Sequence, residues 1–450
     1  MPFPAEDGRR TITRIPMNSH PVGAIIVGGE HPGLGIARSL GQRGIPICLI
    51  DDQHSISQFS KYVTRAVRVK DLRDEHNTVE SVLEVGRRYG LEGWVLFPTR
   101  DETVAAFSRY RDRLAQFFRV TTADWATTRW AWDKKNTYDL AAELGIPVPR
   151  TFNPRTEAEL GELYSRLPLA VKPAVKEHFF YATGAKAWRA ETPAQLHDLF
   201  RKAAQQIKPE EILVQEIIPG NGRQQYSYCA FFCDGKPQSS LVARRLRQHP
   251  REFGRAATYV ETMESSDVPK IEELSKRFLK AIDYYGLVEV EFKQDARDGK
   301  FKLLDVNART WGFHSIGRPA GVDFPYLQYA EQLGEPFDRS RAKGGVGWLR
   351  LVTDVPTVLL DFLAGELDLS AYWDSLKRTR VESVFCLQDP VPSVAEIMLL
   401  PYLVMRKLVV RPTPSCETKP IAEPESAKLT LRAAMNKGSS VSERMLPHEE

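Results

Sequence analysis

The chain has 450 residues, of which 42% are hydrophobic, 27% are charged and 10% are aromatic. These proportions are typical of a folded globular protein of two or three domains, and they exclude a wholly disordered chain, a collagen and a disulfide-rich scaffold. The formal net charge of +4 is too small over this length to indicate a nucleic acid or a membrane as a partner.

The five cysteines predict a cytoplasmic location, because their number is odd and none of them has CxxC spacing. Residues 1–20 hold no apolar stretch of signal-peptide length and are expected to form a flexible leader. No stretch of the sequence has the about 20 uninterrupted apolar residues that a transmembrane helix needs.

An alternation of apolar runs and helical patterns over about 21–125 predicts a Rossmann-like α/β domain with a parallel sheet. The predicted elements are, in chain order, a strand at Val22–Val27, a helix at Ile36–Arg43, a strand at Ile45–Ile50, a helix at Thr78–Tyr89 and a strand at Gly93–Phe97. The glycines between residues 28 and 35 invite a dinucleotide-binding interpretation, but their spacing is not GxGxxG, so an NAD oxidoreductase is the least favoured function. Asp101 and Glu102 follow the last strand and are expected to cap the next helix, with contact to an amine or carboxylate substrate as the alternative.

The region from about 126 to 340 mixes helices with hairpin-connected strands, which predicts an α+β domain. Its predicted strands are Leu169–Lys172, Lys186–Arg189, Ile212–Ile217, Gln225–Phe232 and Ser239–Arg244, followed by a hairpin that turns at Asp298-Gly299. Its predicted helices are one that carries Lys134, one at Pro193–Gln206 and one at Ile271–Tyr285.

The final hairpin of this region carries the most informative pattern in the sequence. Side chains two apart in a strand share a face, so Glu289 and Glu291 point one way on the first strand, and Asp305, Asn307 and Arg309 share one face of the second. Folding the hairpin brings the two polar faces together. Such a crowd of acids needs a positive charge, and Mg²⁺ takes oxygen ligands of this kind together with phosphates. A solvated sheet face is the alternative, but the amide and the guanidinium beside the acids favour a metal–phosphate site.

Two further segments fit a phosphate site. Lys172 closes the short apolar strand Leu169–Lys172, where a buried ammonium is costly unless it meets an anion, either a phosphate or a structural carboxylate. The segment Gln215–Gly220 places one carboxylate among apolar residues at a strand end, which suits an adenine edge without being specific for it.

In this order the motifs resemble those of the ATP-grasp superfamily, over about residues 21–330. The motifs are Asp133-Lys134 followed by Gly145-Ile-Pro-Val-Pro149, Val171-Lys172-Pro173, Gln215-Glu-Ile-Ile-Pro-Gly220, Val290-Glu291-Phe292 and Asp305-Val-Asn-Ala-Arg309. The resemblance is greatest to carboxylate–amine ligases of the D-aspartate-ligase type and to the synthetase domains of carbamoyl-phosphate synthase. It implies an ATP-grasp fold, α/β plus α+β, with a Rossmann-like pre-ATP-grasp domain at 21–125 and an ATP-grasp domain at 126–340, whose lid lies at about 150–225.

The resemblance also implies roles for individual residues. ATP phosphates would be bound by Lys134 and Lys172, adenine by Glu216 and the backbone of Ile218, and ribose by Gln225 or a neighbour. The ligands of Mg²⁺ or Mn²⁺ would be Glu291, Asp305 and Asn307, with Glu289 as a possible helper of lower rank. Arg309 would meet the reacting carboxylate or phosphoryl group.

The sequence departs from its relatives at two places. The loop 173–184 after Lys172 has one glycine where many relatives have a glycine-rich phosphate flap, so Lys176, His178, Thr183 and Lys186 are candidates to replace its backbone contacts. Gln224-Gln225 stands where relatives often have a glutamate, which leaves the ribose contact open.

A run of basic residues, Arg244–Arg251, is expected to form an anion site if its side chains share a surface, with a solvated loop as the alternative. Within the implied fold, Arg245 and Arg247 are assigned to the triphosphate or to an acidic substrate.

The predicted function is therefore an ATP-dependent ligase that joins a small carboxylic acid to an amine through an acylphosphate. Bicarbonate activation of the carboxylase or carbamoyl-phosphate type and a non-catalytic ATP-binding regulatory module are the alternatives, and a homo-oligomer is compatible with all of them. Residues 341–410 form a C-terminal appendage whose fold the pattern does not decide. Its apolar stretch Ile397–Met405 predicts a packed helix, with in-plane membrane contact as the alternative. Residues 411–450, rich in proline and lacking aromatics, are predicted to be a disordered tail.

Overall fold

The computed structural model describes residues 21–409, except 251–252, 255 and 265–266. By their contacts these residues belong to one compact unit, Met1–Pro412. The boundaries expected near residues 125 and 340 therefore stay predictions. The predicted leader and the predicted tail lie outside the described residues.

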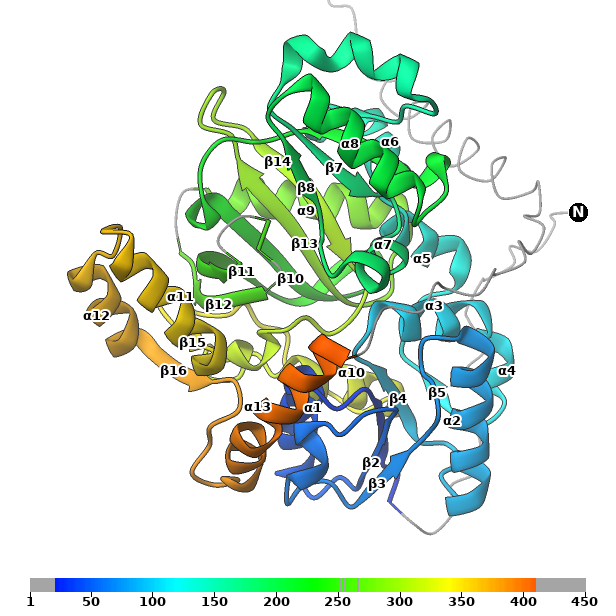
Figure 1. The fold of residues 1–450 in the computed structure, drawn as a ribbon. Coiled ribbons are helices and arrows are strands. Elements are labelled where there is room, and N and C mark those ends of the chain that lie inside the picture. The colour runs from blue at the N-terminus through cyan, green and yellow to red at the C-terminus, as the bar shows by residue number, and fades with distance from the viewer. Residues whose placement is uncertain (1–20, 251–252, 255, 265–266, 410–450) are drawn as a thin grey trace, which may run out of the picture. The chain divides into compact units, whose positions relative to one another are not determined.

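The first part of the chain builds a five-stranded parallel sheet with the strand order β3-β2-β1-β4-β5 (Figure 1). Its strands are β1 (Ala24–Val27), β2 (Ile47–Asp51), β3 (Arg65–Arg68), β4 (Val95–Pro98) and β5 (Arg119–Val120). The connecting helices are α1 (His31–Gly41), η1 (Ile56–Phe59), α2 (Glu75–Tyr89), α3 (Asp101–Arg109) and α4 (Arg111–Ala115). The strand order reverses at β1, so the loops after β1 and β4 flank the place where open parallel sheets bind ligands.

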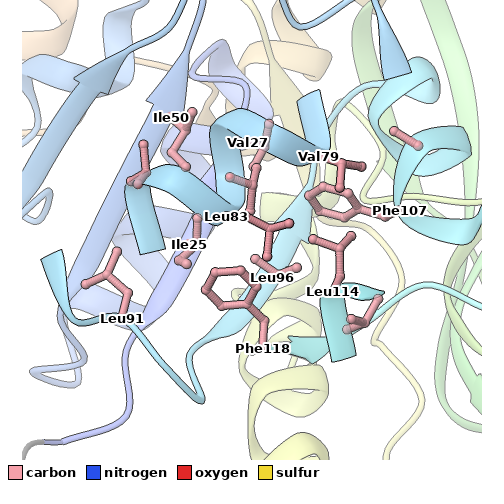
Figure 2. Close-up of a cluster of buried hydrophobic side chains, with 14 of the residues drawn as sticks. Ile25, Val27, Ile50, Val79, Leu83, Leu91, Leu96, Phe107, Leu114 and Phe118 are labelled. Carbon is pink, nitrogen blue, oxygen red and sulfur yellow. The ribbon is translucent and has the colours of Figure 1, made fainter. Parts of the chain in front are cut away.

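Largely apolar runs make the central strands β1, β2 and β4, and their side chains are buried on both faces, as is usual in a parallel sheet. Figure 2 shows one of the resulting cores, in which Ile25 and Leu96 from the sheet pack against Leu83 of α2 and Phe107 of α3. The prediction that the first helix begins near Ile36 is wrong, because α1 begins at His31. Gly33 lies inside α1, where a Cβ atom would come 2.3 Å from the carbonyl oxygen of Gly28, so this glycine serves close packing of helix on strand.

A second, four-stranded antiparallel sheet has the order β6-β9-β7-β8. Its elements are β6 (Thr151–Phe152), η2 (Glu157–Arg166), β7 (Leu169–Pro173), α7 (Lys176–Thr183), β8 (Trp188–Ala190), α8 (Pro193–Ala204), η3 (Pro209–Glu211) and β9 (Ile212–Glu216). Two helices, α5 (Trp125–Trp132) and α6 (Lys134–Glu143), precede it. The predicted strands over β7 and β9 are confirmed, and α7 forms where a loop was expected.

The third sheet has seven strands in the order β14-β13-β10-β11-β12-β15-β16. Its elements are η4 (Gly222–Gln224), β10 (Gln225–Cys233), β11 (Lys236–His249), β12 (Ala256–Thr262), α9 (Val268–Ala281), β13 (Gly286–Gln294), β14 (Phe301–Asn307), η5 (His314–Gly317) and α10 (Phe324–Leu333). The hairpin predicted at Asp234-Gly235 is confirmed, since both residues have the positive φ that a tight two-residue turn requires.

The C-terminal residues extend this sheet. The elements are β15 (Gly347–Leu349), α11 (Leu351–Leu363), α12 (Leu369–Arg378), β16 (Thr379–Glu382) and α13 (Val391–Val409). β15 pairs antiparallel with β12 and parallel with β16, so the predicted appendage shares a sheet with the region before it. The helix expected at Ile397–Met405 is confirmed as part of α13. Within the described part of the chain, no helix combines the length and the apolar character needed to cross a bilayer.

Candidate functional site

The hairpin of β13 and β14 brings its acidic side chains together on one face, as the alternation predicts. Glu291 lies directly opposite Asp305, and Glu289 lies opposite Asn307. Asn307 Nδ2 donates hydrogen bonds of 3.0 Å to Glu289 Oε2 and to Glu291 Oε1. Cross-strand neighbours of this kind have Cβ atoms about 4.5–5.5 Å apart, so the carboxylates form one cluster.

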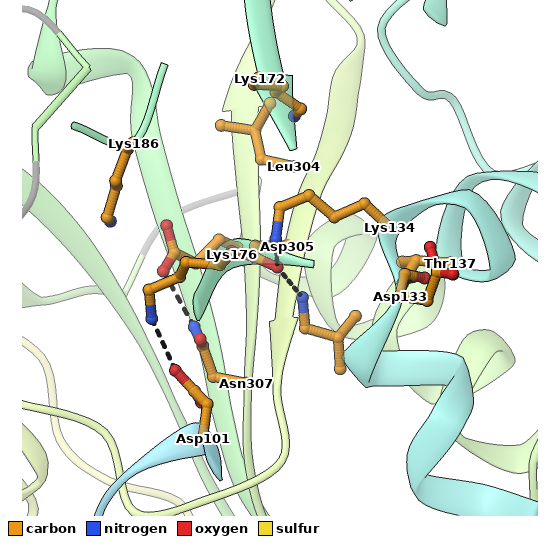
Figure 3. Close-up of polar contacts among 12 residues, drawn as sticks. Asp101, Asp133, Lys134, Thr137, Lys172, Lys176, Lys186, Leu304, Asp305 and Asn307 are labelled. Carbon is orange, nitrogen blue, oxygen red and sulfur yellow. Dashed lines mark hydrogen bonds and ion pairs between the residues drawn. The ribbon is translucent and has the colours of Figure 1, made fainter. Parts of the chain in front are cut away.

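Basic side chains from other elements neutralise this cluster. Lys134, at the first turn of α6, donates to Asp305 Oδ1 at 2.8 Å, and Arg245 of β11 lies 3.3 Å from Glu291 Oε2 (Figure 3 shows the first contact). Burial disfavours the charged form of Asp305, but the Lys134 ammonium outweighs burial and lowers the pKa of the carboxyl. The same pair raises the pKa of Lys134 against the effect of its own burial. Both groups are therefore charged at neutral pH.

Glu289 differs from its neighbours, because no ammonium or guanidinium lies within ion-pairing distance of it in the described residues. Burial, and then the charge of Glu291, raise the pKa of Glu289 to about 7. Ser227 donates to its Oε1 at 2.8 Å. A positive charge placed among these oxygens would stabilise the ionised form.

The oxygens of Glu291, Asp305 and Asn307 could hold a divalent cation. Two opposed carboxylates with a side-chain amide are hard donors that suit Mg²⁺ or Mn²⁺, and Lys134 and Arg245 supply the positive charge that the acids require. No group of three His, Cys, Asp or Glu side chains suited to a metal occurs among the described residues. The candidate set has two carboxylates, and its third member is the amide of Asn307.

Lys172 lies in β7, in the sheet that faces this cluster across the cleft. Its Nζ donates to Tyr138 Oη at 2.7 Å and to Gln215 Oε1 at 2.8 Å. In the described part of the chain no carboxylate lies within ion-pairing distance of it. The structural ion pair that the sequence left open is therefore not formed. A partly buried ammonium that is bound only by neutral oxygens attracts an anion.

Most of the segment predicted as a flap loop folds as α7, which brings Lys176 to the cleft, and Lys186 follows after the end of this helix. Lys176 Nζ lies 2.6 Å from Asp101 Oδ2 (Figure 3). Lys186 Nζ donates to the carbonyl oxygen of Gly254 at 3.3 Å, and burial lowers the pKa of its ammonium to about 8. Both residues are candidates for phosphate contacts. His178 pairs with Glu211 at 2.8 Å, and Thr183 bonds to the backbone of α7, so neither of these two contributes to the cleft.

Asp101 has a role that the capping interpretation missed. The N-cap of α3 is Arg100, and the Asp101 carboxylate instead receives Arg309 Nε at 2.5 Å, Arg309 Nη2 at 3.2 Å and Lys176 Nζ at 2.6 Å. Burial opposes ionisation, but these two cations hold the pKa of Asp101 well below its usual range. The capping prediction is therefore wrong. Its position at the carboxyl end of β4 was the signal that could have found this site.

The space between these groups is small. The cavity lined by Asp101, Lys134, Lys176, Asp305 and Asn307 has a volume of about 30 Å³. A cavity of this size does not admit a nucleotide triphosphate, so ATP binding here requires the elements that line the cavity to move apart.

The predicted adenine contacts are occupied within the chain. The Glu216 carboxylate receives Lys302 Nζ at 2.9 Å, Arg297 Nη2 at 3.1 Å and the backbone N–H of Arg150 at 2.9 Å. The carbonyl oxygen of Ile218 accepts a hydrogen bond of 2.8 Å from Lys293. Both residues line a separate cavity of about 530 Å³ at the end of β9, so their adenine roles stay predictions.

The structure separates the two arginines that the sequence assigned to one anion site. β11 is irregular between Arg245 and Arg247. Arg245 therefore reaches Gln225 Oε1 at 3.1 Å and Glu291, while Arg247 makes a two-pronged ion pair with Asp354 of α11, at 2.7 and 3.0 Å. The condition of a shared surface is therefore not met for this pair, and the assignment of Arg245 and Arg247 to the triphosphate or to an acidic substrate stays a prediction. Gln225 lies beside Arg245, at the cluster.

Comparison with known proteins identifies the fold. No protein-family model matches the chain. Among solved structures, the biotin carboxylase domain of Hydrogenobacter thermophilus 2-oxoglutarate carboxylase superposes with a TM-score of 0.58 and 13% identity, covering 73% of this chain and 74% of that one. An L-amino acid ligase from Bacillus licheniformis superposes with a TM-score of 0.56 and 16% identity, covering 71% and 76%. The chain therefore shares the ATP-grasp fold with these enzymes.

A curated protein that is similar to this chain in sequence is a D-aspartate ligase from Enterococcus faecium. It is 24% identical over 299 residues, which are 63% of this chain and 70% of the ligase. An N5-carboxyaminoimidazole synthetase from Staphylococcus aureus is a further structural neighbour, with a TM-score of 0.55 and 12% identity, covering 72% of this chain and 81% of that one. The Hydrogenobacter structure contains MgADP and bicarbonate.

Proposed function

We propose that this ATP-grasp protein is an ATP-dependent carboxylate–amine ligase, which forms an amide bond and releases ADP and phosphate. The D-aspartate ligase relative and the L-amino acid ligase neighbour support this class of reaction. The substrates are then a small carboxylic acid and a small amine.

The observation that carries the proposal is the way Arg309 and Lys176 hold Asp101. The Asp101 carboxylate accepts hydrogen bonds from Arg309 Nε at 2.5 Å and from Lys176 Nζ at 2.6 Å, beside the acidic cluster. A substrate carboxylate has the same charge and shape as the Asp101 side chain, so Arg309 and Lys176 can receive it in place of Asp101 when α7, which carries Lys176, moves away from α3. The acid to be activated then lies beside the phosphate-binding lysines.

The lysines around the cleft suit the triphosphate. Lys134 of α6, Lys172 of β7 and Lys186, which lies between α7 and β8, bring three ammonium groups to the space above the hairpin. A divalent cation held by Glu291, Asp305 and Asn307 would supply further charge neutralisation at the phosphates. ADP and magnesium in the Hydrogenobacter neighbour support ATP and Mg²⁺ as the cofactors here.

The reaction then needs little covalent chemistry from the protein. Arg309 and Lys176 orient a carboxylate oxygen toward the γ-phosphorus, the oxygen attacks, and ADP leaves, so that an acylphosphate forms. The amine nitrogen attacks the acyl carbon, the C–O bond to phosphate breaks, and the nitrogen loses a proton as the amide forms. A closed α7 excludes water, which would otherwise hydrolyse the acylphosphate.

Bicarbonate activation is the second candidate. It is favoured by the carboxylase and carboxyaminoimidazole synthetase neighbours, whose likeness to this chain is one of fold. In that case Arg309 and Lys176 receive bicarbonate instead of an organic acid. The regulatory module, the homo-oligomer and the cytoplasmic location stay predictions.

The deciding experiment measures ADP release from Mg-ATP in the presence of pooled carboxylic acids, with hydroxylamine as the trapping amine. A ligase yields ADP and a hydroxamate in equal amounts, whereas ADP that depends on bicarbonate alone supports the second candidate. Glu291→Gln should lower turnover by at least a hundredfold, because it removes a charge from the candidate metal set. Full activity in Glu291→Gln would contradict the metal assignment, and tight ATP binding without ADP from any acid would contradict ligase function.

A further inference from the structure

Glu177, the second residue of α7, brings a largely buried carboxylate into the cleft. It lines the cavity of about 30 Å³ together with Asp101 and Lys134, and its side chain is 11% exposed. Its ion-pair partner among the described residues is Lys176, whose Nζ lies 3.7 Å from Glu177 Oε1. The same ammonium lies 2.6 Å from Asp101 Oδ2, so Lys176 holds Asp101 more closely than it holds Glu177.

The two carboxylates beside Lys176 differ in their charge state. Burial, against the opposing charge of Lys176, raises the pKa of Glu177 to about 7, and the negative charges of Asp101 and Glu102 add to the rise. Against its own burial, the pKa of Asp101 is held well below its usual range by Arg309 and Lys176. Neighbouring carboxyl groups whose pKa values are pushed apart suit different tasks, one as a fixed charge and one as a proton carrier. The other titratable side chains that interact electrostatically with Glu177 are Lys134, His178 and Arg309.

The Glu177 carboxylate accepts no hydrogen bond from another residue in the described part of the chain. Two other carboxylates of the site are engaged as acceptors. Glu102 accepts the hydroxyl of Tyr181, and both oxygens of Glu289 accept hydrogen bonds from other side chains. Of these three carboxylates, Glu177 is therefore the one with lone pairs available to a ligand.

Glu177 lies close to the place of the substrate carboxylate, and it moves together with Lys176 because the two are consecutive in α7. An acid bound in place of Asp101 lies as far from Lys176 Nζ as the Asp101 carboxylate does, which is 2.6 Å. Since Glu177 is 3.7 Å from the same atom, the nearest oxygens of the acid and of Glu177 are at most about 6 Å apart. An amine nitrogen that attacks the acyl carbon can thus reach the about 2.6–3.2 Å at which a carboxylate accepts a proton.

The amine substrate of a ligase needs such an acceptor. Amines with ordinary pKa values of about 8 to about 10.4 arrive at neutral pH as ammonium ions, which have no lone pair for an attack. The nitrogen must therefore lose a proton before the C–N bond forms. In a cleft that excludes water, a side chain has to receive this proton.

We propose that Glu177 is the general base of the reaction, which takes a proton from the ammonium form of the amine substrate. This role rests on the proposed ligase function. One N–H bond breaks and its proton passes to Glu177, and the nitrogen lone pair then forms the C–N bond as the C–O bond to phosphate breaks. The leaving phosphate takes the second proton that the nitrogen loses, and Glu177 returns its proton to solvent when α7 opens.

The alternative role for Glu177 is that of a counter-ion, which sets the position of the Lys176 ammonium. The loss of a counter-ion impairs the binding of the acid, so it lowers the yield with every nucleophile alike. The loss of a general base affects only those nucleophiles that arrive protonated. Two small nucleophiles that differ in this property therefore distinguish the two roles.

The test compares hydroxylamine with methylamine, at neutral pH, as nucleophiles for the acid that the ADP-release assay identifies. The two molecules are of nearly equal size, but hydroxylamine is mostly uncharged at this pH, whereas methylamine is protonated like a lysine side chain, with a pKa of about 10. Wild-type chain should form both the hydroxamate and the methylamide. Glu177→Gln, which keeps the size of the side chain, should still form the hydroxamate but should form the methylamide about a hundredfold or more slowly.

Glu210→Gln is the matched control, because it removes a carboxylate of η3 that is 62% exposed and does not line the cavity. This variant should form both products at the wild-type rate. Equal losses of both products in Glu177→Gln would assign Glu177 the counter-ion role and overturn the proposal. An unchanged methylamide rate in Glu177→Gln would overturn it as well, and so would a wild-type chain that forms hydroxamate but no methylamide. A wild-type chain that forms neither product contradicts the ligase function, and the role of Glu177 with it.

Discussion

At the scale of single residues, the cleft is organised by which cations have carboxylate partners. Lys134 and Arg309 are paired within the chain, with Asp305 and Asp101. Lys172 and Lys186 contact only neutral oxygens in the described residues. An ammonium without a carboxylate partner gains more interaction free energy from a bound phosphate than an ammonium that is already paired. Lys172 and Lys186 are therefore expected to contribute more to ATP affinity than Lys134 does.

The lowered pKa of Lys186 makes ATP binding depend on pH. Burial lowers this pKa to about 8, and a bound triphosphate favours the charged ammonium and raises the pKa in the complex. Affinity for ATP is therefore full below pH 8 and falls as the pH rises above 8, by up to tenfold per pH unit. Isothermal titration calorimetry between pH 7 and pH 9.5 measures this dependence.

Lys186→Arg is the matched control for that titration, because a guanidinium stays charged throughout this range. The arginine variant should bind ATP with an affinity that does not change with pH, and Lys186→Met should bind weakly at every pH. A wild-type affinity that stays constant between pH 7 and pH 9.5 would show that the Lys186 ammonium does not contact the nucleotide.

At the scale of elements, the irregularity in β11 directs two neighbouring arginine side chains of this strand to different partners. Arg245 joins the acidic cluster, and Arg247 holds α11 through Asp354. The Arg247 guanidinium also lies between the rings of Tyr259 and Tyr372, 4.6 and 4.9 Å from their centroids. Arg247 thus attaches the C-terminal helices to the sheet.

Removing this attachment should destabilise the fold without touching the chemistry. Arg247→Met leaves the buried Asp354 carboxylate without its counter-ion, which costs about 3–5 kcal/mol of unfolding free energy. Urea denaturation measures the loss. Arg247→Met combined with Asp354→Leu should recover much of the stability, because no buried charge is then left unpaired. Under conditions where the variant is folded, its kcat should equal that of the wild type. A large loss of kcat in the folded variant would show that Arg247 takes part in the reaction.

At the scale of the whole molecule, the loops after the parallel strands, the lid helix α7 and the acidic hairpin meet at one place. Asp101 comes from the start of α3, Lys176 from α7 and Arg309 from the chain just after β14. Tyr181 adds a second link between α7 and α3, since its hydroxyl donates to Glu102. These contacts hold α7 against α3, beside the cavity of about 30 Å³.

Loosening the lid should speed the entry of ATP. Tyr181→Phe removes the hydrogen bond to Glu102 but keeps the ring beside Arg73, 4.3 Å from the guanidinium. A hydrogen bond to a charged group contributes about 1.5–3 kcal/mol, so the association rate of a fluorescent ATP analogue in stopped flow should rise about tenfold or more. Tyr164→Phe, which removes a hydroxyl that bonds to His197 on the outside of the lid, should leave this rate unchanged. An unchanged rate in Tyr181→Phe would mean that the closed lid does not limit ATP entry.

The sequence by itself determined the elements and the shared face of the acidic hairpin. Period-2 alternation and an Asp-Gly turn are local, and they suffice to place Glu291 opposite Asp305. The same holds for Lys172, whose place at the end of an apolar strand already indicated a buried ammonium. Only the tertiary structure decided which partner each charge has. Asp101 and Arg309 are 208 residues apart in the chain, and the separation of Arg245 from Arg247 depends on one irregular step in a strand. Neither the pairing of distant charges nor a local break in strand register has a signature in residue types, because both are set by what packs against them.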